Sequence, residues 1–87
     1  MKYEIFSIKD AQTGFGQLVL DTSEAAAMRG FRLSLAQSYD DLKKMAVNLD
    51  ELALYGFGTF DSESGVFDLY PLPKFLMAGS EEFLNEK

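Results

Sequence analysis

The segment LYGFGTFDSESG, Leu54 to Gly65, decides the fold, because it reads as a strand that runs into a tight turn. Aromatic residues alternate with glycines up to Phe60, and a second apolar run begins at Val66. Asp61 can accept hydrogen bonds from N–H groups of the loop, and Gly65 can adopt the positive φ that closes a four-residue hairpin loop. The segment therefore predicts a β-hairpin flanked by Asp61 and Val66.

This turn also predicts a register, because pairs are counted outward from the flanking residues. The expected pairs are Phe60 with Phe67, Thr59 with Asp68, Gly58 with Leu69 and Phe57 with Tyr70. One face of the hairpin is then expected to carry Leu54, Gly56, Gly58, Phe60, Phe67 and Leu69. The other face is expected to carry Tyr55, Phe57, Thr59, Val66, Asp68 and Tyr70. A helix is expected over the first face, where the glycines allow a close approach.

A second hairpin with the same turn chemistry is predicted near the N-terminus. Asp10 and Gly14 take the places of Asp61 and Gly65, between strand-like runs over residues 2–9 and 15–20. The flanking runs do not otherwise match, so we interpret the likeness as one turn solution used twice. Its two faces are expected to carry Tyr3, Ile5, Leu18 and Leu20 on one side, and Phe6, Ile8, Phe15 and Val19 on the other.

Helical patterns separate the hairpins. Asp21 is an acceptable N-cap for a helix from Thr22 to about Gln37. The apolar stripe of this helix is Ala27, Met28, Phe31 and Leu35. A shorter helix or an ordered loop is predicted over residues 40–48, and residues 74–78 could form a short fifth strand. Pro71 and Pro73 restrict their segment to a sheet edge or an extended run, since proline cannot donate to a ladder.

This element order predicts an α+β fold: an antiparallel sheet of two hairpins with a helix on one face. We interpret residues 1–78 as a single domain. Residues 79–87 form an acidic C-terminal tail, expected to be mobile unless Phe83 and Leu84 dock on the domain. A chain of 87 residues buries only about 60% of its unfolded surface, so pairing with a second copy would add core.

Composition narrows the function. The chain has no histidine and no cysteine, which removes the commonest general base and any thiolate ligand or disulfide. We therefore expect no enzyme, no metal site and no cofactor. The net charge of −6 argues against a broad surface that grips duplex DNA. No apolar run reaches the length of a membrane span, so no membrane partner is expected.

Both faces of the predicted sheet are apolar, although one helix is available to cover them. A sheet face in water should alternate to polar residues, and an exposed aromatic patch usually marks a contact surface. The face is buried in a homodimer or under the tail, or it is a stacking platform for single-stranded DNA. These interpretations are compatible, because a dimer can leave a groove. The candidate binding residues are Phe6, Phe15, Tyr55, Phe57, Tyr70, Lys2, Lys9 and Arg29.

Three blocks of the sequence carry a family resemblance. They are Met1-Lys2-Tyr3, Ile5, Ser7-Ile8-Lys9-Asp10 and Thr13-Gly14-Phe15; Ala26-Ala27-Met28-Arg29 with Phe31; and Leu54-Tyr55, Gly58, Phe60-Asp61 and Ser64-Gly65. Together they resemble the small nonstructural protein, or fifth open reading frame product, of gokushovirus-like microviruses. These are phages with circular single-stranded DNA genomes.

The resemblance implies a non-virion protein of the infected bacterial cytoplasm, associated with genome replication or packaging. It implies no catalytic residues. The expected partners are single-stranded DNA, a second copy of the chain, or phage replication or capsid proteins. Residues 40–48 and the residues after Tyr70 lie outside the resemblance.

Overall fold

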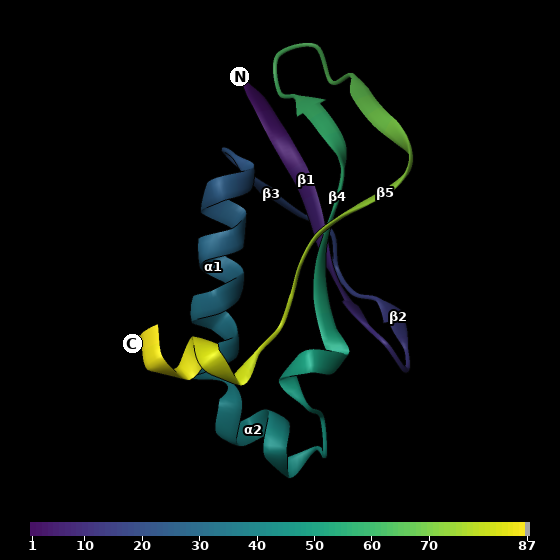
Figure 1. Ribbon diagram of the computed structural model, residues 1–87. Coiled ribbons are helices and arrows are strands. Elements are labelled where there is room, and N and C mark those ends of the chain that lie inside the picture. Colours follow the sequence, from purple (N-terminus) through teal and green to yellow (C-terminus); the bar gives the residue numbers. More distant parts are fainter. Residues whose placement is uncertain (87) are drawn as a thin grey trace.

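In the computed structural model, which describes residues 1–86, an antiparallel sheet lies beside one long helix (Figure 1). The strands are β1 (Lys2–Asp10), β2 (Gly14–Phe15), β3 (Val19–Asp21), β4 (Leu52–Asp61) and β5 (Phe67–Ala78). The helices are α1 (Glu24–Gln37) and α2 (Tyr39–Lys44), with 3₁₀ turns η1 (Leu49–Glu51) and η2 (Glu81–Glu86). The strand order is β2-β1-β4-β5, and β3 also pairs with β1. The predicted α+β fold is confirmed.

The predicted turn between β4 and β5 is present in detail. The N–H of Asp61 donates to the carbonyl of Val66 (3.0 Å), and the N–H of Gly65 donates to the carbonyl of Asp61 (2.8 Å). The Asp61 carboxylate accepts from the N–H of Glu63 at 2.9 Å. Gly65 has a φ of 75°, as the turn requires. The predicted pairs of Phe60, Thr59 and Gly58 with Phe67, Asp68 and Leu69 are confirmed.

Beyond Gly58 the ladder jumps, so the predicted pair of Phe57 with Tyr70 is wrong. Gly58 pairs with Leu69 but Gly56 pairs with Lys74, which leaves residues 70–73 outside the register. Pro71 and Pro73 lie in this gap, because they have no N–H to donate. On the other side of β4, consecutive residues of β1 pair with Gly58 and Gly56, so Phe57 is the extra residue of a β-bulge.

The bulge decides which side chains face α1. Phe6 belongs to the core beneath the helix, and β1 alternates regularly, so Tyr3 points to the opposite face. Phe60 pairs with Tyr3 and therefore also points away from α1. The predicted faces are thus corrected beyond the bulge. Phe60, Phe67 and Leu69 lie on the face away from α1, and Thr59 and Asp68 lie on the other.

The helix α1 covers one face of the sheet with the predicted stripe. Ala27, Phe31 and Leu35 are buried, and Met28 packs against the same core. The N-cap is Ser23, whose Oγ accepts from the N–H of Ala26 at 3.1 Å. The prediction of Asp21 as the cap is corrected, because Asp21 ends β3 and its carboxylate accepts the N–H of Thr22 instead.

The remaining segments close the ends of this core. The predicted helix over residues 40–48 is shorter, and Met45, after its end, is 64% exposed. Residues 74–78 are not a separate strand but the last part of β5. Phe83 of η2 is buried, and its ring lies edge-on to that of Phe31 with centroids 6.2 Å apart. Residue 87 of the expected tail lies outside the described residues.

Candidate functional site

Figure 1 shows α1 on one side of the sheet; the other side, here called the open face, has no helix over it within residues 1–86. Four aromatic rings meet there. Phe15 lies 5.2 Å, between centroids, from both Tyr55 and Phe57, and Tyr55 lies 5.6 Å from Phe75. Neighbouring rings stand edge-to-face, at 74° to 85°. We call Phe15, Tyr55, Phe57 and Phe75 the ring cluster.

Three strands supply these rings. Tyr55 of β4 pairs directly with Phe75 of β5. Phe57 is the residue that the bulge adds to β4. Phe15 comes from β2, which is held against β1 by a hydrogen bond from the fully buried Ser7 Oγ to the carbonyl of Gly16 (3.0 Å). The cluster therefore spans the sheet from one edge to the other.

The cation Lys9 lies over the cluster. Lys9 pairs with Phe15, and its Nζ is 5.4 Å from the Phe15 ring centroid and 5.7 Å from that of Tyr55. At these distances an ammonium group is attracted by the electron-rich faces of the rings. The open face thus combines exposed aromatic surface with a positive charge held in place by that surface.

The two outer rings are accessible. Phe15 is 43% exposed and Phe75 is 56% exposed, whereas Tyr55 and Phe57 between them are partly buried. Covering exposed side chains of this size with a partner removes apolar surface from water, which is energetically favourable. Phe15 and Phe75 are therefore the accessible rings of the cluster, and the two inner rings form its floor.

Lys74, the residue before Phe75, does not add a second charge to the cluster. Its Nζ donates to Glu24 Oε2 at 2.9 Å, on the α1 side of the sheet. This hydrogen bond, with the charge of Glu24, raises the pKa of Lys74 above its ordinary value. Lys74 therefore fastens β5 to the start of α1.

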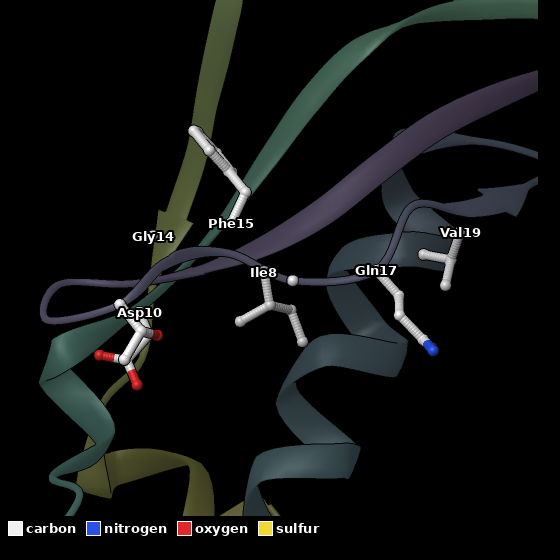
Figure 2. A pocket seen from close by; sticks show the side chains of 8 residues that line it. Ile8, Asp10, Gly14, Phe15, Gln17 and Val19 are labelled. Carbon is white, nitrogen blue, oxygen red and sulfur yellow. The ribbon is translucent and has the colours of Figure 1, made fainter.

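A hollow beside β2 offers a different surface. Figure 2 shows Ile8, Asp10, Gln17 and Val19 on one side of the strands and the ring of Phe15 on the other. The Asp10 carboxylate accepts the N–H of Gln12 at 2.8 Å, so it serves the turn. The hollow is lined by the aliphatic Ile8 and Val19 and by the polar Asp10, Thr13 and Gln17, and it shares Phe15 with the ring cluster.

The comparison with protein families gives one match. The model of the family described as Phage ORF5 protein matches residues 3–82. The chain belongs to the Phage ORF5 protein family. The match covers α1, α2, the whole ring cluster and all of the sheet except Lys2. No match was found among curated proteins or solved structures.

The family membership confirms the phage part of the sequence-based assignment, while the narrower assignment to microviruses stays a prediction. No helix in the described part of this chain has the length and apolar character to cross a membrane.

The structure brings some of the predicted site residues together. Phe15, Tyr55, Phe57 and Lys9 meet on the open face. The placement of Phe6 there is corrected: it is 1% exposed in the core, because alternation along β1 turns it toward α1.

Other predicted residues lie away from the cluster. Tyr70 approaches Gly56 on the same side as Phe6, because its segment leaves the ladder at the two prolines. Lys2 lies at the opposite end of β1 and lines a hollow next to the start of α1. Arg29 is exposed on α1, in the other layer. Sequence reasoning missed Phe75, since register could not be counted across residues 70–73.

Proposed function

We propose that this chain is a phage accessory protein of single-stranded DNA replication or packaging, which works in the host bacterial cytoplasm and binds single-stranded DNA on the ring cluster. The supporting observation is the position of Lys9 over Phe15 and Tyr55. Membership of the phage family supports the setting. The absence of histidine and cysteine favours a binding role over catalysis, which stays a prediction.

The chemistry of this binding is stacking. Every nucleobase has a π-face, so aromatic side chains bind single strands with little sequence preference, at about 1–3 kcal/mol per base. Neighbouring rings of the cluster stand at 74° to 85° to one another, so they do not form one flat platform. We expect one base on Phe15 and another on Phe75, with Lys9 beside the phosphate that joins them.

The charge of the chain determines how DNA binding should depend on salt concentration. The chain carries −6 overall, and Lys9 is the cation that lies over the rings. A protein that neutralises one phosphate of a single strand has a log–log salt slope of only about −0.7. Binding is therefore expected to be weak but to persist in salt, unlike the steep dependence of a basic DNA-binding surface.

The test is a fluorescence anisotropy titration of a labelled oligothymidylate. Phe15→Ala and Phe75→Ala should each weaken binding about 5- to 150-fold, the equivalent of about 1–3 kcal/mol. Phe75→Leu keeps an apolar side chain without a ring, so it should weaken binding nearly as much as Phe75→Ala. Lys9→Met should flatten the salt slope, while Lys2→Met, at the other end of β1, should leave it unchanged.

Two results would overturn the proposal. One is the absence of binding at about 50 μM protein, which would mean a binding free energy weaker than about −6 kcal/mol. The other is equal binding by the wild type and the Phe15→Ala, Phe75→Ala double variant. Full binding by Phe75→Leu would replace stacking with a nonspecific apolar contact.

A further inference from the structure

The sheet continues past the start of α1 as a ribbon of three strands, which Figure 1 shows extending beyond the helix. The ribbon consists of residues 2–5, 58–61 and 67–69. Its two sides differ sharply. Lys2, Glu4, Thr59 and Asp68 lie on the α1 side, and Tyr3, Phe60, Phe67 and Leu69 lie on the open face. The ribbon is therefore amphipathic, although no helix covers its apolar side within residues 1–86.

The apolar side chains form two rows across the strands. Tyr3, Phe60 and Phe67 are directly paired, and the rings of Phe60 and Phe67 lie 4.8 Å apart. In the next row Ile5 is flanked by Leu20 of β3, and Leu69 pairs with Gly58. We call Tyr3, Leu20, Phe60, Phe67 and Leu69 the apolar patch. Phe67 is 61% exposed, Leu69 is 60% exposed and Leu20 is 50% exposed.

We propose that the apolar patch binds the same patch of a second copy of this chain, so that two sheets pack face to face. Charge complementarity favours this partner. A chain of net charge −6 attracts basic proteins, but a basic partner would leave its cations unpaired against a patch that carries no charged side chain. Two negatively charged copies can meet where the surface of both is neutral, and this patch meets that condition.

The edges of the sheet do not offer an alternative route to a dimer. β5 is one edge, and Pro71 and Pro73 interrupt its free N–H groups. The opposite edge is made by β2 and β3, which have two and three residues. Neither edge provides a long continuous row of backbone donors, so two copies are expected to meet through faces.

The size of the patch suits a dimer. Taking roughly 150–250 Å² for each large side chain, the exposed fractions of the patch amount to roughly 400 Å² of apolar surface. A standard interface takes about 800 Å² from each partner, of which somewhat more than half is apolar. The patch therefore supplies about the apolar area that a standard interface needs, with the polar rim of the ribbon supplying the rest.

This inference goes beyond the proposed function and does not depend on it. The patch occupies the start of β1 and the ring cluster lies at its end, near Lys9. A dimer through the ribbon would leave the ring clusters free. It would also place two of them in one particle, which raises the avidity for a strand that reaches both.

Sedimentation velocity of the full chain without DNA tests the dimer, from about 1 to 100 μM. The wild type should sediment as a dimer. Phe67→Glu and Leu69→Lys should each raise the dissociation constant on the order of 100-fold or more, because each buries an unpaired charge. Asp68→Lys is the matched control: the residue lies between these two on the other face, so it should leave the dimer intact.

Circular dichroism checks that the variants keep their fold, and Leu20→Glu replaces Phe67→Glu if the latter unfolds. A wild type that stays monomeric at about 100 μM would overturn the inference, as would dimers that persist in both patch variants. Equal dissociation by Asp68→Lys would also overturn it. Phe75→Ala should sediment as a dimer, so a failure of DNA binding and a failure of dimerisation give different results.

Discussion

Replacing Gly58 with alanine tests the bulge on which both surfaces depend. Gly58 has a φ of 140°, where a residue with a side chain is strained by about 1–3 kcal/mol. A Cβ at this position would also meet the carbonyl oxygen of Asp68 and would lie 2.7 Å from the Leu69 Cα. Because both are backbone atoms of the neighbouring strand, the strand itself must move. We expect a loss of about 3 kcal/mol of unfolding free energy.

Urea unfolding followed by far-UV circular dichroism measures this loss, and a thermal scan gives a second estimate. For a domain of this size each kcal/mol corresponds to about 4–8 °C, so the midpoint should fall by about 12–24 °C. Gly30→Ala is the matched control, since it makes the same chemical change inside α1. A Cβ there has nothing within 4 Å, so the variant should be about 1 kcal/mol more stable than the wild type.

A Gly58→Ala variant within about 0.5 kcal/mol of the wild type would refute the reasoning, because the bulge would then tolerate a side chain. Destabilisation by Gly30→Ala of similar size would also refute it. In that case the effect would belong to any glycine of the chain and not to the strained position in β4.

Three further changes probe the supports of the fold. Ser23→Ala removes the Oγ that accepts the N–H of Ala26, so it should cost about 1 kcal/mol in urea unfolding, and Ser23→Asp should restore it. Phe83→Ala deletes the ring that packs on Phe31 and should cost about 3 kcal/mol; a smaller cost than that of Ser23→Ala would show that η2 adds little. The N–H of Glu63, with a smaller contribution from Ser64, lowers the pKa of Asp61 below its ordinary value of 3.8. A carboxyl group whose pKa is lowered in the folded state stabilises the fold above its ordinary pKa, and this stabilisation is lost as the pH falls. The thermal midpoints of wild type and Asp61→Ala should therefore differ near neutrality and converge below about pH 4. A difference independent of pH would contradict this assignment.

Local chemistry was readable from the sequence. The turn at Asp61 to Gly65 depends on one carboxylate and one glycine, and both act within five residues of each other. The stripe of α1 follows from helical spacing, which puts Phe31 and Leu35 against the core. The open aromatic face followed from counting more apolar residues than one helix can cover.

The sequence did not predict in the same way which face of the sheet each side chain takes. Alternation along β4 predicts that Phe60 shares a face with Leu54, and the bulge at Phe57 and Gly58 reverses this. A bulge is fixed by pairing with β1, which lies far away in the sequence. The position of Phe75 in the cluster could not be predicted for a similar reason, since its pairing with Tyr55 lies beyond a gap in the register that holds two prolines.

The central position of β1 has a consequence for how the chain folds. Its main partner is β4, and Lys2 pairs with Asp61, so β1 is synthesised well before the strand with which it pairs. Only the short β2 and β3 can pair with it earlier. Long sequence separation between paired strands slows folding, because closing the large loop costs entropy before the strand contacts form to offset that cost. During synthesis the edge of β1 that pairs with β4 therefore has unpaired backbone N–H and C=O groups. Nascent chains on the same mRNA are most prone to aggregate before β4 emerges.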